Sequence, residues 1–232
     1  MIEIKNLTKY YGRNAAVKNL SFTVNDNEIL GFLGPNGAGK TTTIKIMTGL
    51  LKPDQGVVEL DGKNMLTDTL DLRRRIGYVP DHFGLYDNLK VSEYMEFFAA
   101  CYHLEGFAAR KRASSLLEQV GLGERKDAFV DGLSRGMQQR LCLARALIHD
   151  PEFLIMDEPT RGIDVGAKHE IYEIMSDLAK QGKAIIMISS EMSELLGMAD
   201  RICVMCNGKL TGEIDQPEEM TQARVMGFAT KF

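Results

Sequence analysis

The chain has 232 residues and a mass of 25.9 kDa, and the 44% of residues that are hydrophobic suffice for one domain with a complete core. Its formal net charge is −4, from 28 basic and 32 acidic residues with no basic block. This balance argues against nucleic acid as a partner.

The first 25 residues predict half-exposed antiparallel strands, because Ile2-Glu-Ile-Lys and Ser21-Phe-Thr-Val alternate apolar and polar side chains. This segment has neither the apolar region nor the cleavage site of a secretion signal. No apolar run in the chain approaches the roughly 18 to 20 residues that cross a bilayer. We therefore expect a cytoplasmic protein, with any membrane-spanning part on another chain.

Beyond residue 25, short apolar runs alternate with longer amphipathic stretches, which predicts an α/β fold with a mainly parallel sheet covered by helices. The segment Val165–Lys180 has the apolar spacing of a core-facing helix. The predicted parallel strands are Glu28–Leu33, Ile76–Pro80, Phe153–Asp157, Ala184–Ser189 and Ile202–Met205.

The run from Gly34 to Thr41 matches the pattern G-x-x-x-x-G-K-[ST], between an apolar strand and a helical stretch, Thr42–Leu50. Its glycines let successive backbone N–H groups point at a polyphosphate, Lys40 supplies a cation, and Thr41 offers a hydroxyl to Mg²⁺. The competing interpretation is a glycine-rich turn with an exposed lysine. The predicted ATP-binding residues here are Gly34, Pro35, Asn36, Gly37, Ala38, Gly39, Lys40, Thr41 and Thr42.

Strand patterns disappear between about Phe83 and Gly132, where Val91–Leu104 and Ala108–Val120 read as helices. We expect a helical subdomain at residues 83–131, inserted into a nucleotide-binding core at 1–82 and 132–232 of a single domain. Its aromatic residues fit either core packing or a docking face for a partner. They are Tyr94, Phe97, Phe98 and Tyr102.

Two acids, Asp157 and Glu158, end the apolar strand Phe153–Asp157. Ligands gather at the carboxyl ends of parallel strands, so we assign Asp157 to Mg²⁺ and Glu158 to the water that attacks the γ-phosphate. The alternative is a pair of solvated acids. Cys203 and Cys206 form a C-x-x-C within a strand-like apolar run, which favours buried core thiols over metal or redox use.

The segment Leu133-Ser-Arg-Gly-Met-Gln-Gln-Arg-Leu141, followed by the Asp157-Glu158 strand, resembles the signature segment of the ATP-binding cassette (ABC) family. Nearly the whole chain resembles that family in the right order. Tyr11 is similar to the aromatic residue that stacks on adenine, although ordinary packing is the alternative. Asp164 resembles the acid of the family's D-loop.

This resemblance implies an ATPase subunit of an ABC transporter, peripheral on the inner face of the cell membrane. It implies that two cassettes, identical or not, pair head to tail, so that Ser134 and Gly136 reach the ATP of the partner. ATP binding closes the pair, hydrolysis releases it, and the motion passes to transmembrane permease subunits.

Two positions depart from the family pattern more than the signature's Arg135 and Met137 do. Asp81 stands where the family has a glutamine that binds Mg²⁺ and senses the γ-phosphate; a carboxylate can bind the metal but adds negative charge. Ser190 stands at the position of the switch histidine and cannot carry imidazolium charge. We therefore predict hydrolysis at a reduced rate.

The two parts of the chain resemble different branches of the family. Residues up to about Met156 resemble exporter-like members, whereas Glu158–Lys168 and Ser189–Gly197 resemble the second cassette of monosaccharide importers. Two other functions stay open: a soluble ABC-type ATPase acting in translation or DNA repair, and a cassette that closes on ATP without turnover.

Overall fold

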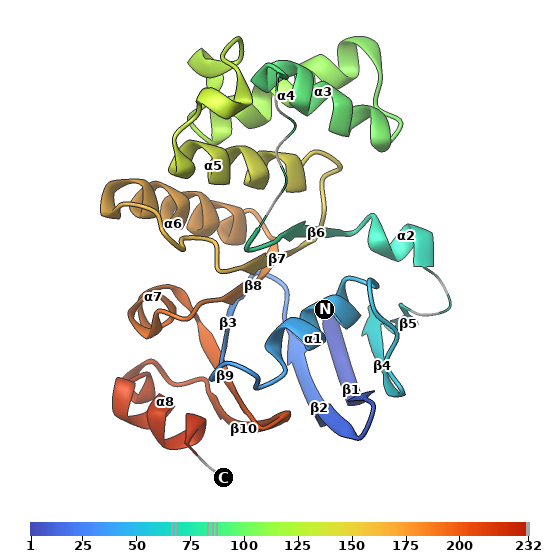
Figure 1. Cartoon of the computed structure of the whole chain (residues 1–232), viewed down its shortest axis with the longest axis vertical. Coiled ribbons are helices and arrows are strands. Elements are labelled where there is room, and N and C mark those ends of the chain that lie inside the picture. Colours follow the sequence, from blue (N-terminus) through green and yellow to red (C-terminus); the bar gives the residue numbers. More distant parts are fainter. Residues whose placement is uncertain (66, 68, 83, 85, 87, 231–232) are drawn as a thin grey trace.

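The computed structural model describes residues 1–65, 67, 69–82, 84, 86 and 88–230. Two sheets and a set of helices make up the molecule (Figure 1). Phe83, where the helical subdomain is predicted to begin, lies outside the described residues. That subdomain boundary stays a prediction.

The larger sheet has six strands in the order β10-β9-β3-β8-β7-β6. All neighbouring strands are parallel except β10, which pairs antiparallel with β9. All five predicted parallel strands are present, and each is short and apolar because helices cover the sheet on both faces. The strands are β3 (Ile29–Leu33), β6 (Ile76–Val79), β7 (Phe153–Asp157), β8 (Ala184–Ile188), β9 (Arg201–Cys206) and β10 (Lys209–Ile214).

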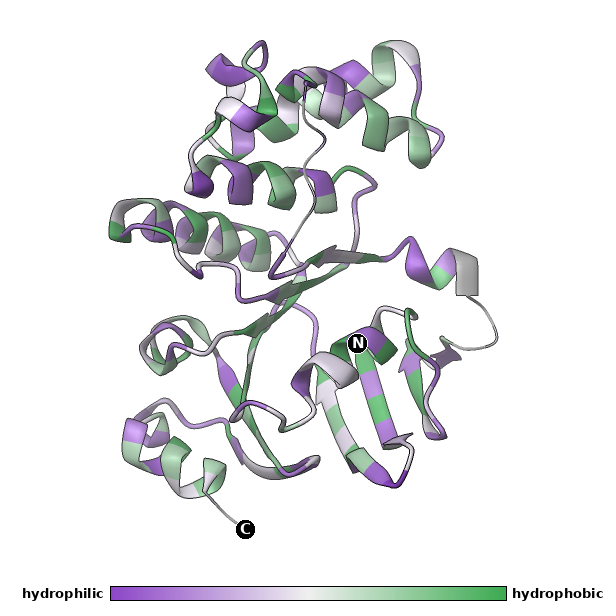
Figure 2. Ribbon diagram, viewed as in Figure 1, coloured by the Kyte–Doolittle hydropathy of each residue, from purple (hydrophilic) through white to green (hydrophobic). Residues whose placement is uncertain are grey.

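The smaller sheet is antiparallel, in the order β2-β1-β4-β5. Figure 2 shows hydrophobic and hydrophilic residues alternating along β1 and β2, as the sequence predicts for strands that bury one face. The strands are β1 (Ile2–Tyr11), β2 (Asn14–Val24), β4 (Gln55–Leu60) and β5 (Lys63–Asn64).

Helices lie on both faces of the larger sheet, and α3 and α4 stand apart from it at one end (Figure 1). The helix predicted at Val165–Lys180 is α6, with the bounds expected. The others are α1 (Lys40–Met47), α2 (Thr69–Arg73), α3 (Val91–Cys101), α4 (Gly106–Gln119), α5 (Arg135–Ala146), α7 (Met192–Met198) and α8 (Gln222–Ala229), with 3₁₀ turns at Gly123–Arg125, Val130–Gly132 and Pro217–Glu219.

The buried side chains form two clusters, one on each face of the larger sheet. One cluster lies between that sheet, α1 and the smaller sheet, and contains Phe22 and Phe32, whose rings stack with centroids 5.3 Å apart. The other joins α5 and α6 to α3 and α4, and includes Tyr94. Cys203 and Cys206 lie buried in β9, as predicted for core thiols, and burial raises the pKa of Cys203 to about 12.

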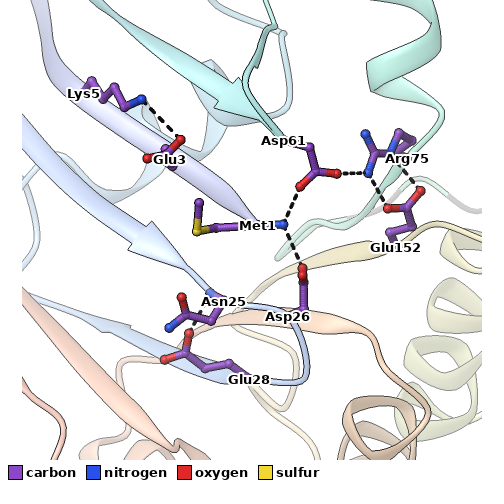
Figure 3. A network of polar contacts seen from close by, with 9 residues as sticks. All are labelled: Met1, Glu3, Lys5, Asn25, Asp26, Glu28, Asp61, Arg75 and Glu152. Atoms are coloured by element: carbon purple, nitrogen blue, oxygen red, sulfur yellow. Dashed lines mark hydrogen bonds and ion pairs between the residues drawn. The ribbon is translucent and has the colours of Figure 1, made fainter.

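A polar network ties the smaller sheet to the larger one (Figure 3). Arg75, just before β6, pairs with Asp61 in the turn between β4 and β5 and with Glu152 just before β7. Asp61 also accepts a hydrogen bond of 2.7 Å from the Met1 nitrogen. These contacts link the two sheets at the amino ends of β6 and β7, whereas Asp157 lies at the carboxyl end of β7.

The aromatic residues that were predicted either to pack in the core or to form a docking face differ in their exposure. Tyr94 is fully buried, whereas Phe97 is 47% exposed. No helix in the described part of the chain is both long and apolar enough to cross a membrane.

Candidate functional site

The predicted phosphate-binding residues form the loop between β3 and α1 together with the first three residues of α1 (the phosphate loop, residues 34–42). A Cβ on Gly34 would lie 2.3 Å from the Met205 carbonyl oxygen, and one on Gly39 would lie 2.4 Å from the Ala16 carbonyl oxygen. Gly39 also has φ of +103°, which side chains rarely tolerate. Glycine is therefore required here by close packing against β9 and β2. A helix follows as predicted, but α1 spans Lys40–Met47 and so begins two residues before the predicted stretch Thr42–Leu50.

Lys40 folds back over this loop. Its Nζ donates hydrogen bonds to the carbonyl oxygens of Gly34 at 2.5 Å and Pro35 at 3.2 Å. Burial lowers the pKa of Lys40, although the nearby Glu158 and Asp157 charges oppose that shift. A polyphosphate in the loop would give this half-buried ammonium group the anionic partner that two carbonyls do not supply.

Asp157 lies at the carboxyl end of β7, as predicted, and is 9% exposed. Burial is the main cause that raises its pKa to about 6, and the charges of Glu158 and Asp81 add to it. The two predicted metal-binding carboxylates, Asp81 and Asp157, are thus close enough for the charge of Asp81 to raise the pKa of Asp157. A divalent cation there would offset their mutual repulsion.

Asp81 follows β6 and has two partners on one oxygen. Its Oδ2 accepts a hydrogen bond of 2.9 Å from Arg161 Nη1 and lies 3.0 Å from His82 Nδ1. Its Oδ1 is buried and has no hydrogen-bond partner among the described residues. One oxygen is therefore neutralised by Arg161, and the other is left without the ligand that a buried carboxylate oxygen requires.

Glu158 and Ser190, both assigned to catalysis from the sequence, are in direct contact. Glu158 Oε2 accepts hydrogen bonds from the backbone N–H and from Oγ of Ser190, each 2.9 Å long. The Glu158 backbone has φ of +51° and donates to the Ile188 carbonyl oxygen at 2.8 Å. Ser190 thus holds the Glu158 carboxylate, a role that does not follow from its position in the sequence alone.

Ser134 and Asp164 each begin a helix. Ser134 Oγ accepts from the Met137 N–H at 3.3 Å at the start of α5, and Asp164 Oδ1 accepts from the Ala167 N–H at 3.0 Å at the start of α6. Gly136 permits close packing, because a Cβ there would lie 2.7 Å from Ala167 Cβ. These residues therefore also serve the folding of their own helices.

The structure does not bring this segment to the phosphate loop. Figure 1 shows the start of α5 well away from the loop between β3 and α1. Within the described ranges, no hydrogen bond or ion pair joins Ser134 to residues 34–42. Tyr11, at the end of β1, is 53% exposed, so its ring is not used in the core as the packing alternative required.

Sequence reasoning missed the polar residues that surround the Glu158–Ser190 pair. Thr160, Ser189 and Lys168 converge on Glu194, and Arg161 pairs with Asp81. These residues lie up to 34 positions apart, and Arg161 lies 80 positions from its partner Asp81. The segments Glu158–Lys168 and Ser189–Gly197 were noted for their resemblance to monosaccharide importers, but no local pattern in them predicts that their side chains contact one another.

Comparison with known proteins gives a consistent result. The family described as "ABC transporter" matches residues 17–161. A Nod factor export ATP-binding protein I of Ralstonia nicotianae is 39% identical over 95% of this chain and 68% of its own length. A linearmycin resistance ATP-binding protein of Bacillus subtilis is also 39% identical, over 90% of this chain and 68% of its own.

Solved structures also resemble the chain over nearly its whole length. A dimeric, post-hydrolysis state of an ATP-binding cassette bound to ADP and Pi superposes with a TM-score of 0.82 at 28% identity, over 92% of this chain and 98% of that one. An ATP-binding subunit of an ABC transporter superposes with a TM-score of 0.84 at 27% identity, over 100% and 95%.

Proposed function

Because this chain belongs to the ABC transporter family as an ATP-binding cassette, and is an ATP-hydrolysing transporter subunit, we propose how its own residues bind ATP, hydrolyse it and transmit the result. The observation that carries the proposal is the contact of Glu158 with Ser190 at the strand ends that face the phosphate loop.

The phosphate loop binds the triphosphate, and Tyr11 stacks on adenine. The backbone N–H groups of residues 34–42 and the start of α1 provide donors and partial positive charge. Lys40 moves from the Gly34 and Pro35 carbonyl oxygens onto the β- and γ-phosphates. The exposed Tyr11 ring needs no rearrangement to receive the base.

Thr41, Asp81 and Asp157 hold Mg²⁺. Two carboxylates and one hydroxyl are hard oxygen ligands, and phosphate oxygens of the substrate would complete the set. The raised pKa of Asp157 and the unpartnered Oδ1 of Asp81 both fit a cation at this position. The bound ion would neutralise charge that develops on the phosphates during hydrolysis.

Glu158 orients and deprotonates the attacking water. Ser190 fixes the carboxylate through two hydrogen bonds to Oε2, which leaves Oε1 available to the water. Serine supplies this positioning but no positive charge at the γ-phosphate, so turnover is slower than an imidazole at the same place would allow.

A second cassette completes each site. Ser134 is exposed at the start of α5, on a part of the chain remote from its own phosphate loop. In a head-to-tail pair, Ser134, Gly136 and Asp164 of one copy would meet the ATP held by the other. The solved cassette to which the chain is similar is dimeric, which supports the pairing of two cassettes.

The subunit works beside transmembrane permease subunits on the inner face of the membrane. The exposed Phe97 on α3 supplies apolar surface through which closure of the cassettes would reach them.

Light scattering with the Glu158→Gln protein tests the proposal. With Mg-ATP this variant should form a stable dimer, because it binds nucleotide without hydrolysing it. The matched control carries Lys40→Ala as well and should stay monomeric. A Glu158→Gln protein that releases phosphate at the wild-type rate would contradict the assignment of Glu158, and one that neither turns over nor dimerises would contradict the pairing.

A further inference from the structure

A buried carboxylate contacts residues that neighbour the catalytic pair in the sequence. Glu194, in the first turn of α7, has a side chain only 5% exposed. Its Oε2 accepts a hydrogen bond of 2.6 Å from Ser189 Oγ, and its Oε1 accepts one of 2.8 Å from Lys168 Nζ. Thr160 Oγ1 lies 2.7 Å from both oxygens. Both carboxylate oxygens are thus fully used by donors from three other segments.

The partners of Glu194 flank the catalytic pair on both sides. Thr160 stands two positions after Glu158, in the turn closed by the hydrogen bond of 3.2 Å from the Arg161 N–H to the Glu158 carbonyl oxygen. Ser189 immediately precedes Ser190. One carboxylate therefore connects the segment that carries Glu158 to the segment that carries Ser190.

The Ser189 side chain adds a second constraint. Its Oγ donates to Glu194 and accepts a hydrogen bond of 3.0 Å from the Glu191 N–H. Ser190 lies between these two anchored positions, and its own N–H and Oγ both point at Glu158. The direction of those two donors is thus set by the contacts on either side of Ser190.

The charge of Glu194 is retained despite its burial. Burial acts to raise its pKa, but hydrogen bonds from Lys168, Ser189, Thr160 and Tyr172 outweigh it, and the pKa lies below its ordinary range. An apolar residue would pack this position without the cost of desolvating a carboxylate, but it could not accept from several donors at once.

We infer that Glu194 is a positioning residue for ATP hydrolysis, which aligns Ser190 and Glu158 by holding Ser189 and Thr160. The inference rests on the proposed roles of Glu158 and Ser190. It predicts that loss of the carboxylate leaves nucleotide binding intact and lowers turnover, because misplacement of a catalytic group by about 1 Å costs up to about 100-fold in rate.

The test compares Glu194→Gln with Glu191→Gln in the full chain. Lys168 pairs with both acids, at 2.7 Å to Glu191 and 2.8 Å to Glu194, but of the two carboxylates only that of Glu194 accepts hydrogen bonds from Thr160 and Ser189, since Glu191 contacts Ser189 through its backbone N–H. Glu194→Gln should lower kcat at least about tenfold, with KM for ATP and the Mg-free Kd within about twofold. Glu191→Gln should leave all three values within about twofold.

Variants of Thr160 provide a second, independent test if Glu194→Gln does not fold. Thr160→Val removes the hydroxyl at constant shape and should lower kcat, whereas Thr160→Ser keeps the hydroxyl and should restore it. Wild-type kcat in Glu194→Gln or in Thr160→Val would overturn the inference, and so would loss of Mg-free ATP binding that accounts for the whole defect. Glu158→Gln in the same assay separates the two claims, because wild-type turnover there would refute the proposed function instead.

Discussion

Two regions of the molecule face each other across the candidate site, and they are built in different ways. The phosphate loop is one contiguous segment whose shape comes from backbone geometry and from glycines pressed against β2 and β9. The region opposite, with Glu158 and Ser190, is assembled by side-chain hydrogen bonds among residues far apart in the chain. The first region should govern binding and stability, and the second should govern turnover.

The largest effect on stability should come from adding a single methyl group to the phosphate loop. Gly39→Ala places a Cβ 2.4 Å from the Ala16 carbonyl oxygen at φ of +103°, and should lower the free energy of unfolding by roughly 3 kcal/mol or more. Gly37→Ala is the control, because φ there is +80° but nothing lies within 4 Å; it should cost about 1 kcal/mol. Urea unfolding measures both, and equal losses would show that packing against β2 is unimportant.

In the region opposite the phosphate loop, removing the charge of Asp157 should stabilise the protein. The pKa of Asp157 is raised to about 6, so the folded state binds its proton more tightly than the unfolded chain does. This contribution to stability is therefore lost as pH rises through the window from about 4 to about 6. Without Mg²⁺, Asp157→Asn should raise the free energy of unfolding at pH 8 by about 1 to 3 kcal/mol, with little gain near pH 4.

The same measurement on an exposed acid sharpens that result. Asp131→Asn changes an exposed residue of a 3₁₀ turn and should change the free energy of unfolding at pH 8 by less than about 0.5 kcal/mol. If Asp157→Asn destabilises the metal-free protein at pH 8, the proposed clustering of charge around Asp157 is wrong.

A smaller effect, on rate, should follow from changing Ser190. Ser190→Ala keeps the backbone hydrogen bond to Glu158 and loses the one from Oγ, so kcat should fall about threefold to tenfold. Ser190→His should raise ATPase turnover, because imidazole adds charge at the γ-phosphate that serine lacks. A vesicle assay of phosphate release by ATP hydrolysis checks both variants. An unchanged or lower rate for Ser190→His would mean that the missing imidazole does not limit hydrolysis.

The same contrast explains how far sequence reasoning reached. The five parallel strands, α6 and the phosphate loop depend on local patterns, and all were predicted. Strands β4, β5 and β10 were not, because half-exposed residues such as those of Lys209–Ile214 give weak periodicity. The helix caps made by Ser134 and Asp164 had a local signal, a Ser or Asp directly before a helix.

The contacts of the other acidic residues around the site could not be predicted. The pairs Asp81–Arg161 and Thr160–Glu194 join residues 80 and 34 positions apart, and only the folded sheet brings them together. The resemblance of the chain's two parts to different branches of the family stays a prediction.

The most direct test of the account is calorimetry of Mg-ATP binding to the folded wild-type chain and to Lys40→Ala. The account predicts clear binding by the wild type and a loss of affinity of at least about tenfold in the variant, because a charged hydrogen-bond donor to phosphate is removed. Absence of binding by the folded wild type, or binding that is undiminished without Lys40, would contradict it.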